Sequence, residues 1–427
     1  MWQVLKSAWA LLLGILLLMI GNGLQGSLMG IRGAIENFST SELSIITSAY
    51  FVGFLFGSRT APELIRRVGH IRVFAALGSF ISAVLILYPT ITEPWAWILL
   101  RVVFGFSFSG VYVTAESWLN NAATNQTRGK ALSLYMIVQM TGIVISQALL
   151  NVADPAGYVL FVIPSVLVSL SFAPILLSVT PTPAFETTKA MSLGALFRVS
   201  PTGIVGMFIM GMVFAAQFGM ASVYGTEAGL SVAEISIFVS AIFTGGMVLQ
   251  FPFGWFSDRM DRRVLILTAA VVGGLGSVLG FALGSSFEFL LVAGFLIGGM
   301  SNPLYALLIA YTNDYLGTEN MAAASGGMIF VNGMGAIMGP ILTGWAMSVA
   351  GPAGFWAYLA LTFAALSLYV LYRMTQRPSP YSEEADYDAV SYAPVMPTAT
   401  SVVLEAAQEF YAENADTDEE VSPKRGV

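Results

Sequence analysis

The sequence has no cysteine and only one histidine. The absence of cysteine excludes disulfide bonds, thiol nucleophiles and thiolate metal ligands, and a single histidine excludes a metal centre built from several imidazoles. The pattern G-x-x-x-x-G-K-[ST], which cradles nucleotide phosphates, is also missing. We therefore expect no metal, no cofactor and no ATP-driven step, and we expect that the protein is not an enzyme.

Charged residues are scarce as well. They make up 10% of the 427 residues, against roughly 25% in soluble domains, whereas 56% of the residues are hydrophobic. A bilayer accepts such a surface, and one spanning helix needs about 20 mostly apolar residues. Hydropathy predicts an all-α integral membrane protein with twelve transmembrane helices, near residues 8–30, 41–60, 71–92, 94–119, 129–151, 156–179, 200–225, 232–256, 263–284, 287–313, 321–349 and 352–374.

Two stretches fall outside the apolar segments. Residues 180–199 contain Pro181 and Pro183 and separate the sixth segment from the seventh. Residues 378–427 carry 11 of the 25 acidic residues and two of the 18 bases, and they lack the apolar content to fold alone. We predict an N-terminal six-helix bundle (1–179), a cytoplasmic inter-bundle loop (180–199), a C-terminal six-helix bundle (200–377) and an acidic, disordered cytoplasmic tail (378–427).

Lysine and arginine residues gather on alternate connections. Such residues stay on the cytoplasmic side during insertion. With a cytoplasmic N-terminus, sixteen of the 18 bases fall on that side, Arg32 falls outside and Arg101 falls within a span. We therefore expect a multi-pass protein with both termini in the cytoplasm.

The two halves match each other at an offset of 192–193 residues. Chance similarity between apolar sequences is the alternative, but polar identities in register argue against it. Two six-span halves related by an axis along the membrane normal are one known transporter plan. The matching pairs include Ser39/Ser231, Glu42/Glu234, Ser44/Ser236, Gly53/Gly245, Gln25/Gln217, Gly105/Gly298, Tyr112/Tyr305, Gln139/Asn332 and Gly142/Gly335.

The loop after the eighth span reads GWFSDRMDRR, residues 254–263. It resembles the G-x-x-x-D-R-x-G-R-R signature of the major facilitator superfamily, with Asp261 where the family usually has glycine. The first-half copy is degenerate, because Arg66 stands opposite Asp258, and Arg101–Gly105 looks like the family's R-x-x-x-G element. The resemblance covers residues 1–377. It implies two six-helix bundles around a central cavity that opens to either side in turn, and it names no substrate.

Arg101 is the foremost candidate for a site residue. A charge inside the membrane costs several kcal/mol, with estimates from about 2.5 to above 10, so it faces a wet cavity or a partner. We interpret it as a ligand for an anionic group of the solute or as a bias on proton uptake; a structural hydrogen bond is the alternative. The family resemblance, in which this arginine is often tied to coupling, favours the first interpretation.

Neutral polar residues of spans one, four, seven and ten are further candidates. The resemblance implies that these spans line the cavity, where amides and hydroxyls can bind a solute without burying a charge. The alternative is that they join packed helices, at about 0.6–2 kcal/mol per contact. These candidates are Asn22, Gln25, Tyr112, Gln217, Tyr224, Asn302 and Tyr305.

Charged residues at the cytoplasmic ends of the spans are predicted to form salt bridges that hold one conformation closed. The alternative is a solvated basic loop that only obeys the orientation rule. The predicted gating residues are Arg66, Arg67, Glu116, Arg128, Asp258, Arg259, Arg262, Arg263 and Asp314.

Together these patterns predict a secondary transporter that moves a small organic solute by alternating access. Proton coupling stays open, as do the substrate and the direction. A membrane sensor or scaffold on the same fold, signalling through the acidic tail, is the alternative. We expect a monomer in the lipid bilayer of a bacterial inner membrane, with a small-molecule substrate and no nucleic-acid partner.

Overall fold

The structure is a computed structural model that describes residues 2–122, 128–176 and 191–376, together with Tyr392, Val395, Met396, Thr400 and Val402. Within these residues the chain forms helices and no strand. The helices are α1 (Trp2–Ile35), α2 (Thr40–Val68), α3 (His70–Leu87), α4 (Pro94–Ala122), α5 (Arg128–Leu149), α6 (Val159–Leu176), α7 (Leu193–Val199), α8 (Pro201–Ala215), the π-helix η1 (Ala216–Met220), α9 (Ala221–Glu227), α10 (Val232–Ser257), α11 (Arg262–Leu283), α12 (Phe287–Asn313), α13 (Thr318–Ala350) and α14 (Ala353–Gln376).

The predicted twelve spans are confirmed in the described part of the chain. Ten segments are long and apolar enough to cross a membrane, and the apolar helices Ser133–Leu149 and Val159–Pro174 occupy the places of the fifth and sixth predicted spans. The seventh span consists of α8, η1 and α9 in succession. α7 is an additional short helix in the predicted inter-bundle loop, whose residues 180–190 lie outside the described residues.

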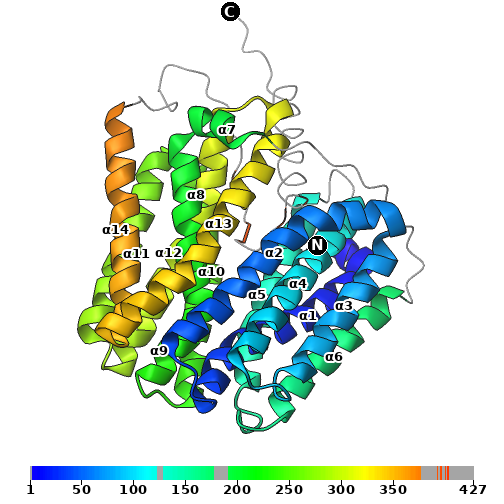
Figure 1. Ribbon diagram of the computed structural model, residues 1–427. Helices are drawn as coiled ribbons and strands as arrows, with labels where there is room; N and C mark the ends of the chain where they lie inside the picture. Colours follow the sequence, from blue (N-terminus) through cyan, green and yellow to red (C-terminus); the bar gives the residue numbers. More distant parts are fainter. Residues whose placement is uncertain are drawn as a thin grey trace, which may run out of the picture.

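The spans form two bundles, α1–α6 and α8–α14, which Figure 1 shows side by side. In the first bundle α1 packs on α5 and α6, and α2 packs on α4; in the second, α8 packs on α13, and α10 packs on α12. The same pairs of equivalent helices therefore touch in both halves. We call the end of the molecule that carries α7 the α7 face, and the opposite end, where α9 meets α10, the α9 face (Figure 1).

The repeat pairs found in the sequence build the same local structures twice. Ser39 begins α2 and Ser231 begins α10, each with a capping box. The Ser39 amide donates to Glu42 over 2.8 Å, and the Ser231 amide donates to Glu234 over the same distance. These reciprocal bonds satisfy amide groups that the first helical turn leaves unpaired. Each six-helix half thus starts its second span in the same way.

Glycines at equivalent positions let the central helices of each half approach closely. A Cβ atom on Gly53 or Gly105 would lie 2.0 or 1.9 Å from a backbone oxygen of the facing helix, at the α2–α4 contact. A Cβ atom on Gly245 or Gly298 would lie 2.1 or 1.9 Å from a backbone oxygen at the α10–α12 contact. Small residues permit such packing where no hydrophobic force drives helices together. The two halves therefore share their core geometry.

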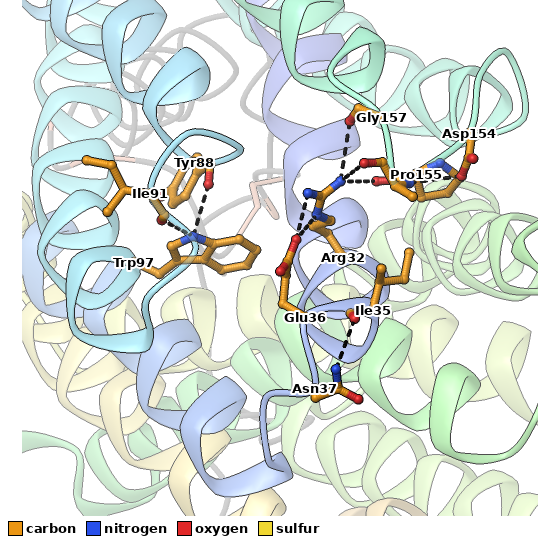
Figure 2. Close-up of polar contacts among 11 residues, drawn as sticks. Arg32, Ile35, Glu36, Asn37, Tyr88, Ile91, Trp97, Asp154, Pro155 and Gly157 are labelled. Atoms are coloured by element: carbon orange, nitrogen blue, oxygen red, sulfur yellow. Dashed lines mark hydrogen bonds and ion pairs between the residues drawn. The ribbon is translucent and has the colours of Figure 1, made fainter.

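Arg32 ties together the α9-face end of the first bundle (Figure 2). Its guanidinium lies 2.6 Å from a Glu36 carboxylate oxygen and donates to backbone oxygens of residues 155–157, in the connection between α5 and α6. Nearby, the Trp97 indole donates to the Tyr88 oxygen over 3.1 Å and joins α4 to the end of α3. These bonds fix the connections at this face.

Candidate functional site

Arg101 is buried in α4 and binds α1. The side chain is 1% exposed, and its Nη1 donates to the Gln25 side-chain oxygen over 2.5 Å. Its guanidinium carbon lies 5.2 Å from the centre of the Tyr50 ring on α2, in the range of a cation–π contact. Among the described residues no carboxylate forms an ion pair with it. Neutral dipoles and an aromatic face therefore surround this positive charge.

Asn22, one helical turn before Gln25 on α1, links this polar cluster to Tyr112 of α4. The Asn22 amide donates to the Tyr112 hydroxyl over 3.1 Å, and that hydroxyl lies 3.3 Å from the Met19 sulfur. Asn22, Gln25, Arg101 and Tyr112 are all at most 2% exposed. The structure thus brings together the four first-half candidates on α1 and α4.

The equivalent helices of the second half carry a neutral polar cluster. Gln217 lies in η1, and its amide donates to the Ile297 oxygen over 3.3 Å. Ser301 of α12 donates to the Gln217 side-chain oxygen over 2.9 Å. π-Helical turns inside longer helices are frequent at functional sites. At the same offset Arg101 corresponds to Gly294, so the second-half cluster has no counterpart of the Arg101 charge.

Asn302 and Tyr305 follow Ser301 on α12. Asn302 is 4% exposed and packs against Gly246 of α10, and Tyr305 is fully buried. Both side chains therefore lie inside the protein on the same helix as Ser301.

Phe218 connects the two polar clusters. Its ring centre lies 6.0 Å from that of Tyr50, the ring beneath the Arg101 guanidinium, and 6.3 Å from that of Phe243 on α10. Gly26 of α1 leaves room for the same ring, because a Cβ there would lie 3.3 Å from it. The sequence analysis missed Tyr50 and Phe218, since apolar aromatic residues are common throughout the spans. Together they form an aromatic layer between Arg101 and Gln217.

Tyr224 lies in a different environment. Its ring stacks on Phe355 with centres 5.1 Å apart and also contacts Trp356 and Phe238. This aromatic cluster belongs to the second bundle near the α9 face. The structure joins Tyr224 to neither polar cluster by a hydrogen bond, and its predicted place in the site stays a prediction.

Buried polar atoms near the clusters lack partners. Within the described residues, Gln25 Nε2, Asn302 Oδ1, the Tyr305 hydroxyl and both polar atoms of the Gln250 amide form no hydrogen bond. Leaving such a group unpaired costs about 1–3 kcal/mol, so native proteins rarely do so. Helices α1, α10 and α12 therefore carry buried polar groups whose hydrogen-bonding capacity the described residues do not use.

Gln250 lies at the contact between the two bundles. It lines a small cavity between α5 and α10, together with Ser133, Met136, Met140 and Met247. Three of these five residues are methionines, whose side chains are flexible and apolar. The unpaired amide of Gln250 therefore sits in a mostly apolar gap between the halves.

Hydrogen bonds join the bundles in the α9-side half of the spans. Gly219 of η1 also packs directly on Thr47 of α2, where a Cβ on the glycine would lie 2.0 Å from the threonine methyl group. The two bundles are therefore closely packed on this side. The bonds run from Thr40 Oγ1 to the Glu227 carboxylate, from Ser48 Oγ to the Ile337 oxygen (2.8 Å) and from Ser236 Oγ to the Gln147 oxygen (2.5 Å).

At the α7 face several charged residues form ion pairs within their own bundle. Glu63, which the sequence analysis did not select, binds both Arg66 and Arg67 on its own helix, and the Arg128 side chain lies outside the described side chains. Arg259 stacks over Trp255, with 4.3 Å between the guanidinium carbon and the ring centre. The gating role of these residues stays a prediction. In the second half, Arg262 pairs with Asp314 and lies 3.9 Å from Asp258, and Arg263 pairs with Asp261 over 2.8 Å.

Glu116 differs from the other predicted gating residues because it is 1% exposed inside the first bundle. Its carboxylate accepts a hydrogen bond from the Tyr135 hydroxyl over 2.8 Å. A separate contact involves Arg59 of α2, which stacks over Phe330 of α13 with 3.9 Å between the guanidinium carbon and the ring centre. That contact joins the two bundles toward the α7 face.

Two related bundles with paired polar clusters define a multi-span membrane transporter. The profile of the Major Facilitator Superfamily matches residues 11–238 and, in a second match, residues 203–408. The chain therefore belongs to the Major Facilitator Superfamily, the family that its loop 254–263 resembles.

Curated relatives agree with this assignment. The chain is 24% identical over 334 residues to the MFS-type transporter YcaD of Salmonella heidelberg (strain SL476), which covers 77% of this chain and 86% of the relative. It is 25% identical over 341 residues to the MFS-type transporter Ent638_1421 of Enterobacter sp. (strain 638), covering 79% and 88%. These names support transport across a membrane as the general activity.

Solved structures share the fold. The nucleoside transporter NupG aligns with a TM-score of 0.67 at 14% identity, over 86% of this chain and 98% of that chain. A bacterial homologue of the human lysosomal transporter Spinster, in an inward-facing and unoccupied conformation, aligns with a TM-score of 0.63 at 14% identity, over 98% and 99%. At this identity the likeness shows the fold alone.

Proposed function

We propose that this protein is a secondary transporter that moves a small organic solute by alternating access between its two bundles. The observation that carries the proposal is the pair of equivalent polar clusters, on α1–α4 and on η1–α12, which meet at the Tyr50–Phe218 layer. The hydrogen bonds between the bundles on the α9 side support a conformation closed on that side. We further propose a monomer in which residues 1–179 form the N-terminal bundle, residues 180–199 the inter-bundle loop and residues 200–377 the C-terminal bundle.

The proposed orientation places the α7 face in the cytoplasm of a bacterium. Arg66 and Arg67 end α2 there, and Arg262 and Arg263 begin α11 at the same face. Basic residues next to spans remain on the cytoplasmic side during insertion. Both chain termini then lie in the cytoplasm, and the bacterial relatives support the inner membrane as the location.

The proposed solute carries an anionic group, alone or in a zwitterion. Arg101 supplies a buried guanidinium without a carboxylate partner in the described part of the chain, and its Nε is unpaired. Arg is suited to such recognition because its planar fork matches carboxylate and phosphate groups. The amides and hydroxyls of Asn22, Gln217 and Tyr305 then bind neutral polar groups of the solute.

The test begins with a thermal-shift screen of organic anions, zwitterions and neutral polar solutes on the detergent-purified protein. Any solute that stabilises the protein is then used for flux measurements in proteoliposomes. Arg101→Ala is expected to raise the half-saturation concentration about ten- to hundredfold, because a hydrogen bond to a charged group contributes about 1.5–3 kcal/mol.

Arg198→Ala is the matched control, since it removes the same side chain from an exposed position on α7. It should leave flux unchanged. Wild-type flux from a folded Arg101→Ala protein would sink the proposed role of this residue. Stabilisation by a solute without any flux would favour the alternative of a membrane sensor, and equal rates with and without an imposed pH gradient would exclude proton coupling.

A further inference from the structure

A segment of the C-terminal tail packs into the transmembrane part of the molecule. Tyr392, Val395, Met396 and Thr400 are 5%, 3%, 2% and 1% exposed. The aromatic and aliphatic members, with Val402, join the hydrophobic core of the two bundles. Figure 1 shows the coloured pieces of this segment between the bundles. We call these five described residues, Tyr392, Val395, Met396, Thr400 and Val402, the tail segment.

The tail segment binds the first bundle through Glu116. The Thr400 amide donates to one carboxylate oxygen of Glu116 over 3.1 Å, and the Thr400 hydroxyl donates to the same oxygen. The other carboxylate oxygen accepts the bond from Tyr135. Glu116 lies within the last two turns of α4, at the α7 side. A buried carboxylate that the transport site does not use is therefore satisfied in part by the tail.

The tail segment binds the second bundle through α10. The Tyr392 amide donates to an Asp258 carboxylate oxygen over 3.0 Å. The Tyr392 ring lies on Gly254, where a Cβ atom would come within 2.8 Å of it. Asp258 caps the end of α10 at the α7 face, and Gly254 lies one turn before it. The same short segment therefore contacts the facing ends of α4 and α10.

The tail segment therefore lies between the α7-side end of α4 in the first bundle and the α7-side end of α10 in the second. In the conformation open to the α9 face, the α7-side ends of the bundles must come together, and α4 and α10 would then occupy the space of the tail segment. A ligand that binds one conformation only shifts the population toward it. We propose that the tail segment is an internal ligand bound between the α7-side ends of α4 and α10, which blocks solute passage and holds the bundles in this conformation until it leaves.

This inference rests on the proposed alternating-access function. The expected rise in solute flux on release of the tail follows from the fraction of molecules that have the tail segment bound. If the segment occupies the crevice about nine-tenths of the time, about one-tenth of the molecules can transport, and release of the tail raises flux about tenfold.

Two variants of the full chain test it. Val395→Asp with Met396→Asp places charges in the buried apolar contact and expels the tail without changing any span. Asn414→Asp with Ala415→Asp adds the same charges elsewhere in the tail and is the control. The first variant should raise the initial flux in proteoliposomes several-fold, about tenfold for the occupancy above, and the control should transport at the wild-type rate. Equal flux in all three proteins would overturn the proposal.

A second measurement reports tail binding without transport. The chain has no native cysteine, so a single Val395→Cys substitution provides one thiol. It should react slowly with a maleimide in the otherwise native chain and about tenfold faster when Met396→Asp is added. Equal reactivity in both proteins would overturn tail binding. If neither wild type nor variant carries any solute, the transport function fails, whereas the thiol reactivity still decides whether the tail binds.

Discussion

A cross-link between the bundles on the α9 side tests alternating access directly. Thr47 of α2 and Gly219 of η1 belong to different bundles, and a Cβ atom on Gly219 would lie 3.3 Å from the Thr47 Cβ. Disulfides need Cβ–Cβ distances of about 3.5–4.5 Å. Thr47→Cys also removes the methyl group that would lie 2.0 Å from the new Cβ. A disulfide between Thr47→Cys and Gly219→Cys therefore requires a shift of only a few tenths of an ångström.

The disulfide leaves too little freedom for opening on that side. Because it holds the two Cβ atoms within about 4.5 Å, they can separate by only about 1 Å from their present distance of 3.3 Å. A water molecule alone needs a gap of about 2.8 Å, twice the usual 1.4-Å probe radius. We therefore expect flux to fall in proportion to the cross-linked fraction.

The assay is solute flux in proteoliposomes after oxidation and again after reduction. Reduction should restore the flux of the Thr47→Cys/Gly219→Cys protein. The control pair is Gly21→Cys/Pro164→Cys, which joins α1 to α6 within one bundle at a Cβ–Cβ distance of 3.6 Å. Its oxidation should leave flux unchanged. Undiminished flux from the fully cross-linked inter-bundle pair would refute opening on the α9 side, and with it alternating access between the two bundles.

Two further predictions concern the stability of the detergent-purified protein. Gly105→Ala places a Cβ 1.9 Å from a backbone oxygen and should cost about 1–3 kcal/mol, whereas Gly194→Ala meets no atom within 4 Å and should not lower the melting temperature. Asp314→Asn leaves Arg262, 4% exposed, without its buried carboxylate and should cost about 3 kcal/mol; Glu63→Gln, which breaks an exposed pair, should leave the melting temperature unchanged. A lower melting temperature for Gly194→Ala than for Gly105→Ala would contradict the close α2–α4 packing. A lower melting temperature for Glu63→Gln than for Asp314→Asn would contradict the buried Arg262–Asp314 ion pair.

Much of the fold follows from the sequence because two of its signals are simple. A spanning helix must be apolar over about 20 residues, so hydropathy located all twelve spans. The repeat was equally visible, because the pairs Ser39/Ser231 and Gly53/Gly245 perform the same local tasks, capping a helix and allowing close approach. Those tasks restrict the residue type strongly, and the pairs therefore remain recognisable.

The candidate site was only partly predictable. Polar residues inside spans are conspicuous, so Gln25, Arg101 and Gln217 were selected, and the structure joins them to partners. Tyr50 and Phe218 were missed because aromatic residues occur throughout the spans. The sequence does not indicate which of them lie near the site. The π-helical turn at Gln217 depends on the backbone bonding of its neighbours, which no pattern of residue types revealed.

The sequence did not predict which charged residues form ion pairs, for a different reason. The charged residues at the α7 face were identified, but many arginines stand close to many carboxylates along the chain. Glu63 pairs with Arg66 and Arg67 because they lie three and four residues apart on one helix. Arg262 reaches Asp314 on another helix, and only the packing of α11 against α12 determines that contact.

The two halves differ at Arg101, and this difference matters most for recognition of the solute. Gln25 accepts a hydrogen bond from Arg101, whereas its counterpart Gln217 accepts one from Ser301, and Gly294 replaces the arginine in the second half. Gln25 therefore positions the only charge of the two clusters, and Gln217 does not.

Consequently, Gln25→Ala should weaken transport of an anionic solute about tenfold more than that of a neutral analogue of equal size, because positioning of the guanidinium affects a charged hydrogen bond worth about 1.5–3 kcal/mol. Gln217→Ala should weaken both by the same factor. The ratio of half-saturation concentrations for the two solutes measures this difference and does not depend on how much protein is reconstituted. If Gln25→Ala shifted both solutes equally, Arg101 would not contact the solute's charge, and its bond to Gln25 would serve only to join α4 to α1.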